Sequence, residues 1–282
     1  MAHVCGVLLA VGLAAVSVAA PAQAEGYEVG VASYTFRQGT AFEAIEKTKA
    51  CGGDVIEFFL WQKLGAEHPG VVLNQDLSDA QVAALKAKLQ ASGVKAVNAY
   101  FNNAVFQDPS QAEARVRKLF EFARKLGLRG LTGEPPADRL DLVEKMVKEY
   151  DIRFCFHNHP KDPKKPDYRN WDPVYLLSLM DKRDPRMGFS VDTGHLSRSG
   201  VDPVETVRLF GKRVLSVHLK DVKEATKESI DVRYGQGIGN MAGVLAELKL
   251  QGFGGHVAIE YENLTDRLAD DVTFCLDFVR TH

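Results

Sequence analysis

Several imidazole and carboxylate side chains occupy the same kind of place in this sequence, at the end of an apolar run and just before a loop. They are His157 in FCFHNHP, Asp192 in GFSVDTGH, His218 in VLSVHLKDV, Glu260 in HVAIEYE and Glu134 in GLTGEPP. A mixture of imidazole and carboxylate suits a divalent ion, Mn²⁺ first, with Zn²⁺, Co²⁺ and Fe²⁺ as alternatives. Such an ion can polarise a carbonyl and stabilise the charge left when a neighbouring proton is removed. Isomerisation of a sugar needs this chemistry.

Strand alternation predicts that these side chains converge. Successive side chains of a strand point to opposite faces, so each polar residue opposes the apolar residues beside it. Buried charges are costly unless they are paired or bound to a metal. A metal site is therefore favoured over separate structural roles, and the predicted ligands are His157, Asp192, His218 and Glu260.

Lys220 and His195 lie close to these positions, and each has two interpretations. Lys220 points the same way as His218, so it either holds an oxyanion or a carboxylate or forms a salt bridge with Glu260 or Glu262. His195 follows Asp192 by three residues, so it either reaches a substrate or caps the next helix.

Two residues near the second apolar run are candidates for binding a sugar. Glu57 in DVIEFF faces inward by parity and could bind hydroxyl groups. Trp61 lies where this run meets a loop, where either sugar stacking or ordinary packing explains it. Gly235, Gly237 and Gly239 in YGQGIGN come too late for a phosphate fingerprint and predict a flexible loop.

The elements that must position these residues alternate between strand and helix. Apolar or alternating runs predict eight strands, at 29–36, 54–59, 95–102, 130–134, 153–159, 187–192, 214–220 and 256–262. Helical periodicity is clear over 112–126 and 139–150. Ser78 with Gln81 forms a capping box, and Asp172-Pro173 and Asp202-Pro203 mark two more helix starts. Eight strands alternating with helices predict a closed α/β fold, the single-domain (β/α)₈ TIM barrel.

The long connections follow strand ends, at 60–77, 160–171 and 221–239. In a barrel of this kind the active site is built from these loops. The loop 160–171 is basic and rich in proline, which suggests either a lid that steers an anionic substrate or a solvated charged loop.

The N-terminal segment resembles a secretory signal. Residues 4–20 form an apolar run, and Ala22 and Ala24 then form a small-x-small cleavage site. We expect cleavage before Glu25, export, a periplasmic location, and a barrel over 25–282; a retained membrane anchor is the alternative. The later sequence has no run long and apolar enough to cross a bilayer.

Charge and cysteine content exclude other classes of protein. The net charge of −2 gives no reason to expect nucleic acid or anionic lipid as a partner. Of four cysteines, Cys5 lies in the signal, which leaves Cys51, Cys155 and Cys275 far apart and odd in number. A disulfide scaffold is therefore not indicated, and buried packing is expected instead.

At these residues the chain resembles the xylose isomerase-like TIM-barrel superfamily, the sugar phosphate isomerase/epimerase group. The motifs that carry the resemblance are VIEFF, FHNHP, SVDTGH, VHLKD, GQGIGN and IEYE, in this order along the chain. The resemblance implies that His157, Asp192, His218 and Glu260 hold the metal. It also implies a small carbohydrate as substrate and allows a homo-oligomer.

One position departs from the ketose 3-epimerases of this group. They carry Glu at the fifth-strand position and use it with the eighth-strand Glu as an acid/base pair, whereas this chain has His157. The HNHP form resembles an exported branch that acts on 3-keto-glycosides. On that resemblance His159, Glu134 or Lys220 takes the proton next to the carbonyl, and Glu260 remains a candidate for proton transfer.

The first functional hypothesis is a metal-dependent sugar isomerase or epimerase that removes a proton α to a carbonyl. A close rival is a lyase or hydratase on 3-keto-glycosides, which uses the same proton abstraction and then loses a β-leaving group. Phosphodiester hydrolysis, as in apurinic endonucleases, is disfavoured by the charge of −2 and the export signal. A sugar-binding protein without catalysis is disfavoured by the retention of all four ligands.

Overall fold

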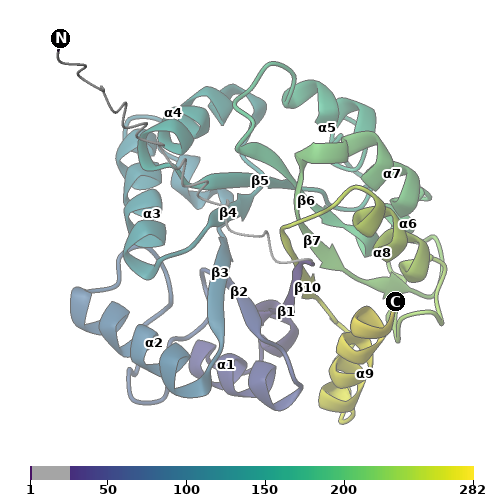
Figure 1. Cartoon of the computed structure of the whole chain (residues 1–282), viewed down its shortest axis with the longest axis horizontal. Helices are drawn as coiled ribbons and strands as arrows, with labels where there is room; N and C mark the ends of the chain where they lie inside the picture. The colour runs from purple at the N-terminus through teal and green to yellow at the C-terminus, as the bar shows by residue number, and fades with distance from the viewer. Residues whose placement is uncertain (2–25) are drawn as a thin grey trace.

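Eight parallel strands close into a barrel with helices around it, which confirms the predicted TIM barrel (Figure 1). The computed structural model describes residue 1 and residues 26–282, so the predicted signal segment lies outside the described residues. Around the barrel the strand order is β1-β10-β7-β6-β5-β4-β3-β2. The barrel strands are β1 (Glu28–Ala32), β2 (Val55–Phe59), β3 (Lys95–Tyr100), β4 (Gly130–Gly133), β5 (Arg153–His157), β6 (Met187–Asp192), β7 (Val214–Leu219) and β10 (His256–Ile259).

Helices connect successive strands and cover the outside of the barrel. They are α1 (Ala41–Ala50), α2 (Asp79–Ser92), α3 (Ala112–Leu126), α4 (Leu140–Tyr150), α5 (Pro173–Leu179), α6 (Thr193–Arg198), α7 (Pro203–Phe210), α8 (Met241–Leu250) and α9 (Leu268–Thr281). The predicted caps are confirmed: Ser78 and Gln81 form the capping box of α2, and Asp172 and Asp202 accept amide hydrogens at the starts of α5 and α7. The β6–β7 connection holds two helices rather than one, because α6 begins directly at Asp192.

The first strand is shorter than predicted. Residues Ser33–Phe36 form a 3₁₀ turn instead of continuing β1. Two hydroxyl groups replace the ladder there: Ser33 Oγ accepts from the amide of Phe59 (3.0 Å), and Thr35 Oγ1 accepts from the amide of Tyr261 (3.0 Å). These long-range side-chain bonds take the place of strand pairing at the end of β1.

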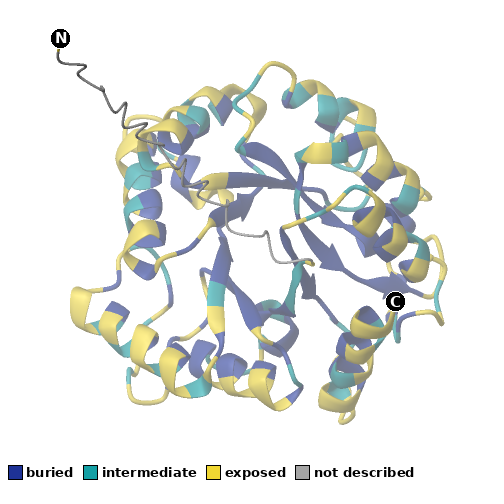
Figure 2. Cartoon of the chain, in the orientation of Figure 1, coloured by how far each residue is buried: buried dark blue, intermediate teal, exposed yellow. Residues whose placement is uncertain are grey.

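The main apolar core lies between the outward faces of the strands and the helices. Figure 2 shows the strands buried and the outer faces of the helices exposed. The ring of Phe189 on β6 stacks on that of Phe210 on α7 at 3.8 Å between centroids. In α3, Val116, Leu119 and Phe120 are buried, as the helical periodicity predicts. Each such side chain contributes about 1.5–3 kcal/mol when it leaves water.

The long loops after β2, β5 and β7 leave the same, carboxyl end of the barrel. The loop after β7 contains a small antiparallel hairpin of β8 (Asp221–Val222) and β9 (Asp231–Val232). Within residues 26–282, no helix combines the length and the apolar character that a membrane crossing requires.

Candidate metal centre and active site

The structure brings the four predicted metal ligands together at the carboxyl end of the barrel. Four neighbouring strand ends supply them, and one donor atom from each lies within 4.8 Å of the others. Nε2 of His157 lies 3.2 Å from Nδ1 of His218, which lies 3.2 Å from Oε2 of Glu260. Oδ2 of Asp192 lies 3.7 Å from Nε2 of His157. All four side chains are buried.

These residues fit a divalent ion. Ligands at about 2.0–2.2 Å from one ion lie roughly 3–4.4 Å from each other, close to the separations here. Oδ2 of Asp192 is a buried oxygen that makes no hydrogen bond among the described residues and lies 3.2 Å from the ammonium of Lys220, so its place already suits positive charge. Two nitrogens and two carboxylate oxygens suit Mn²⁺, Zn²⁺, Co²⁺ or Fe²⁺.

Lys220 balances the charge of this cluster. Its Nζ atom lies 3.2 Å from Oδ2 of Asp192 and 3.0 Å from Oε2 of Glu260, and it also pairs with Glu262. Three carboxylates and one ammonium leave two negative charges, which a divalent ion would neutralise. The salt-bridge interpretation of Lys220 is confirmed, with both Glu260 and Glu262, and its role toward an oxyanion stays a prediction.

The lysine reaches this position because Gly194 has no side chain. A Cβ atom at Gly194 would lie 2.5 Å from Cδ of Lys220, so the stem of Lys220 occupies the space that a larger residue would need. Burial opposes the charge on Lys220, but Asp192, Glu260 and Glu262 outweigh it and raise its pKa well above the usual value.

Asp192 is held from two sides. Its Oδ1 atom accepts from the amide of His195 (2.7 Å) and so caps α6, which leaves Oδ2 facing the other ligands. Asn158 clamps its backbone: the Asn158 side chain donates to the carbonyl of Asp192 (2.9 Å) and accepts from its amide (2.8 Å). The cap of α6 is therefore Asp192, and the ring of His195 stays free to lie in the cluster.

The protonation states favour metal binding by three of the four ligands. Burial lowers the pKa of His157 and keeps its imidazole neutral. Burial opposes the charge on Asp192 and Glu260, but nearby positive groups lower the pKa of Asp192 well below its usual range and that of Glu260 to about 2. His218 differs: burial opposes its charge, yet Glu57 and Glu260 raise its pKa to about 10.

His159 and Glu134 form a second group beside the cluster. Nδ1 of His159 contacts Oε1 of Glu134, and the other carboxylate oxygen accepts from Tyr168 (2.7 Å) and Asn170 (2.9 Å). Burial opposes the charge on Glu134, but His159 and these two donors lower its pKa to about 2. The His159 side chain is 36 % exposed, and no hydrogen bond found within residues 26–282 uses its Nε2 atom.

The predicted sugar-binding residues lie in different surroundings. Trp61 is 38 % exposed and packs edge-on against Phe59 and Tyr100, with ring centroids 5.1 and 5.6 Å away. It lines a hollow of about 390 Å³ together with Tyr34 and Arg37. His195 stacks on His159 with ring centroids 4.8 Å apart. Both positions are compatible with their predicted roles.

Glu57 contacts two histidine side chains inside the barrel, whereas a sugar-binding role would place it at an open surface of the site. Its side chain is fully buried below the cluster, where Oε2 lies 3.2 Å from Nε2 of His218 and 2.9 Å from Nε2 of His256. Its role in binding substrate hydroxyls stays a prediction.

The glycine-rich segment 235–239 is built around a carboxylate rather than left flexible. The amides of Gly235, Gly237 and Gly239 all donate to Asp221, each at 3.0 Å. A Cβ atom at Gly237 would lie 2.3 Å from Oδ1 of Asp221, so the segment needs glycine there. The two amides between them donate to backbone carbonyls, at Arg233 and Val222.

Sequence reasoning missed several residues that shape the site. Asn158 and His256 had a usable signal, because His256 shares the inward parity of Glu260 and Asn158 lies inside the HNHP motif. Tyr168 and Asn170 come from the basic loop after β5 and had no signal, since their contact with Glu134 joins two distant segments.

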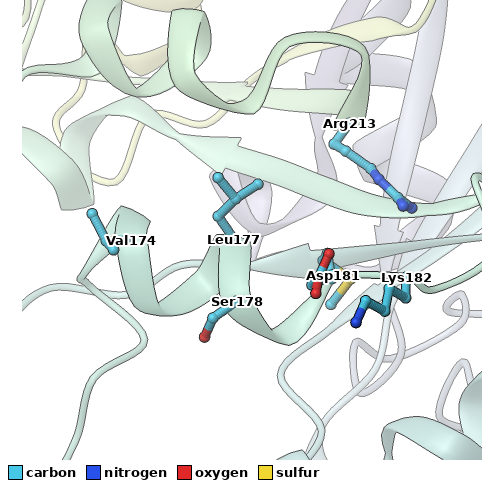
Figure 3. A pocket seen from close by; sticks show the side chains of 7 residues that line it. Val174, Leu177, Ser178, Asp181, Lys182 and Arg213 are labelled. Atoms are coloured by element: carbon cyan, nitrogen blue, oxygen red, sulfur yellow. The ribbon is translucent and has the colours of Figure 1, made fainter.

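A further hollow of about 580 Å³ lies beside α5, lined by Val174, Leu177, Ser178, Met180, Asp181, Lys182 and Arg213 (Figure 3). It contains none of the candidate site residues.

Comparison with known proteins identifies the family. The profile described as xylose isomerase-like TIM barrel matches residues 45–277. The chain belongs to this family. An uncharacterised protein of Parabacteroides distasonis is 31 % identical in sequence, with a TM-score of 0.70 over 90 % of this chain and 98 % of that one.

Two curated members of known name match parts of the chain. The inosose dehydratase of Clostridium tetani is 32 % identical over 89 residues, which are 31 % of this chain and 28 % of the relative. The rhizopine catabolism protein MocC of Rhizobium meliloti is 29 % identical over 157 residues, or 50 % and 46 % of the two chains. The matches thus span less than half of each relative.

Solved structures of family-like fold include a D-allulose 3-epimerase from Methylomonas. Its TM-score is 0.68 at 17 % identity, over 90 % of this chain and 97 % of that one, which shows a shared fold alone.

Proposed function

We propose that this protein is a metal-dependent carbon–oxygen lyase that acts on a keto-sugar or a keto-polyol. The observation that carries the proposal is that one proton-accepting group, Nε2 of His159, is free beside the predicted metal ligands. Removal of a proton α to a carbonyl followed by loss of a β-oxygen needs one such group.

His159 is the best-placed base of the three candidates. Lys220 is enclosed by three carboxylates and stays protonated. Both oxygens of Glu134 are already occupied by donors. Glu134 instead orients His159 by holding the proton on Nδ1, which leaves Nε2 as the nitrogen that can accept one. Burial opposes the charge on His159, but Glu134 outweighs it and raises the pKa of His159.

The other steps of the proposed reaction are metal binding and proton transfer, and different residues carry them out. His157, Asp192, His218 and Glu260 would hold the ion, which when bound polarises a carbonyl oxygen and stabilises the charge that develops on it. His159 takes the α-proton as the C–H electrons form the new double bond and the β C–O bond breaks. The proton held by His159 then passes to the departing oxygen.

The relatives support elimination as the outcome. The names of the matched dehydratases describe loss of water from inosose. Isomerisation or epimerisation, the first expectation from the sequence, is the second candidate. It is favoured by the carboxylate of Glu260, which directly follows β10. A two-carboxylate epimerase would need an acid in place of His157, and this imidazole faces the other ligands instead.

Product analysis distinguishes the two reactions. We would incubate the protein and Mn²⁺ with 3-keto-glycosides and keto-inositols in D₂O and analyse the products by mass spectrometry. A product lighter by one water, or a freed aglycone, supports the lyase. An isomer of the substrate that carries solvent deuterium would replace the lyase by an isomerase, and no exchange and no product with either class would refute both.

The metal site has its own test. Asp192→Asn and His218→Ala should each lose both bound Mn²⁺ and activity, as measured by metal analysis after dialysis and by turnover. Full turnover of either variant without bound metal would contradict the mechanism.

We also propose that the chain is exported and processed before Glu25. The apolar run 4–20 and the small residues Ala22 and Ala24 support this. The mass of protein recovered from the periplasm would reveal the cleavage site, and a full-length mass in the membrane fraction would show a retained anchor instead.

A further inference from the structure

Three ionisable side chains form a chain through the barrel interior below the metal ligands. Nε2 of His256 lies 2.9 Å from Oε2 of Glu57, and the same oxygen lies 3.2 Å from Nε2 of His218. The three residues come from β10, β2 and β7, and each is buried.

Such groups are unusual at this depth of a barrel. The interior of a (β/α)₈ barrel is normally filled by layers of branched apolar side chains. An ionised carboxylate there is costly unless it has partners. Here Oε1 of Glu57 is buried with no hydrogen-bond partner among the described residues, so packing alone does not explain why a carboxylate occupies this place.

The orientation of His218 shows what Glu57 can do. Nδ1 of His218 faces the metal ligands, 3.2 Å from Nε2 of His157 and 3.2 Å from Oε2 of Glu260. The opposite nitrogen, Nε2, makes no hydrogen bond among the described residues, and Oε2 of Glu57, 3.2 Å away, is the carboxylate within its reach. An imidazole binds a metal through a nitrogen that has no proton, so its proton must sit on the other nitrogen. Histidine ligands commonly donate that second N–H to a carboxylate, which fixes the ring and strengthens the ligand.

We propose that Glu57 is a positioning residue of the metal centre, which orients His218 with Nδ1 toward the ion, and that His256 holds Glu57 in place. The inference rests on the proposed metal site. Glu57 acts through His218 and touches no substrate, because its side chain is fully buried. His256 limits the carboxylate to one orientation by donating to the oxygen that serves His218.

Metal affinity in the absence of substrate tests this role. Metal-free wild type, Glu57→Gln and His256→Gln would be titrated with Mn²⁺ by calorimetry and with Co²⁺ by visible absorption, which reports the geometry of the ligands. Ser216→Ala is the matched control: Ser216 lies two residues before His218 on β7, and its buried hydroxyl has no hydrogen-bond partner in the described part of the chain. Circular dichroism would show that each variant is folded.

We expect Glu57→Gln to weaken Mn²⁺ binding roughly 10- to 100-fold and to change the Co²⁺ spectrum. His256→Gln should weaken binding less and in the same direction, and Ser216→Ala should stay within about twofold of wild type, since it leaves every ligand support in place. If Glu57→Gln fails to fold, His256→Gln carries the test, because it leaves the carboxylate present.

Folded Glu57→Gln with wild-type Mn²⁺ affinity and an unchanged Co²⁺ spectrum would overturn the inference while leaving the metal site intact. An equal loss in Ser216→Ala would also overturn it, because the effect would then be general damage to the barrel. A wild-type chain that binds neither ion would instead remove the proposed function, and this inference with it.

Discussion

The ammonium of Lys220 lies 3.0 Å from Oε2 of Glu260, inside the ring of residues predicted to bind a metal. Asp192 and Glu262 also lie against this ammonium, so three carboxylates surround it. A bound metal ion and the Lys220 ammonium would therefore neutralise the charge of the same carboxylates. If either one is removed, the stability of the fold should depend more strongly on the other.

Lys220→Met should destabilise the metal-free protein. Breaking a buried ion pair costs about 3 kcal/mol or more, because the remaining charges stay buried without compensation. Added Mn²⁺ should recover part of this loss by supplying positive charge. Urea unfolding with and without Mn²⁺ would measure both effects, with the exposed Lys95→Met as control. Equal stability of Lys220→Met and wild type without metal would contradict this account.

His159→Gln should remove the base and leave the metal site. We expect turnover to fall by about 10²- to 10⁴-fold, the usual contribution of a general base, with Mn²⁺ affinity close to wild type. Glu134→Gln should lower turnover less, because it only releases the orientation of His159. Steady-state kinetics and washout of α-deuterium would measure both. Unchanged washout in His159→Gln would assign the proton transfer to another group.

Metal affinity should rise with pH. Burial opposes the charge on His218, but Glu57 and Glu260 raise its pKa to about 10, so the metal-free site holds a proton that an ion must displace. Below that pKa the apparent association constant should rise about tenfold per pH unit, because one proton is released for each ion bound. Calorimetry in buffers of different ionisation enthalpy would count the proton. Affinity independent of pH between about 6 and 8 would contradict it.

Asn158→Ala should damage both stability and metal binding. The Asn158 side chain makes two buried hydrogen bonds to the backbone of Asp192. Their loss leaves an amide and a carbonyl unpaired, which costs about 2 kcal/mol or more. Thermal unfolding and Mn²⁺ titration would measure the two effects. Asn102→Ala, which removes an exposed cap at Asn103–Phe106, should change neither by a comparable amount.

The sequence was sufficient to predict the barrel and the meeting of the four ligands, because both follow from local regularities. Alternation along a strand predicts that the side chains of His157 and Asp192 point into the barrel. Parallel pairing then brings the carboxyl ends of the strands to the same end of the barrel. The same parity, extended by two residues from Ala258, would have placed His256 inside the barrel.

The rest depended on contacts between distant segments. Ser33 and Thr35 end β1 early by bonding to the last residue of β2 and to a residue that follows β10, which no local pattern reports. Tyr168 and Asn170 reach Glu134 from a loop whose composition indicated only charge and stiffness. For Lys220 the sequence predicted Glu260 or Glu262 as a partner, whereas the structure shows both and adds Asp192 from another strand.

The glycine-rich segment has a consequence for the binding of phosphate groups. All five amides of residues 235–239 are already engaged within the chain, three of them by the carboxylate of Asp221. A phosphate group arriving there would meet an anion and no free donor. Residues 235–239 could therefore bind a phosphate only by giving up contacts that the chain already makes.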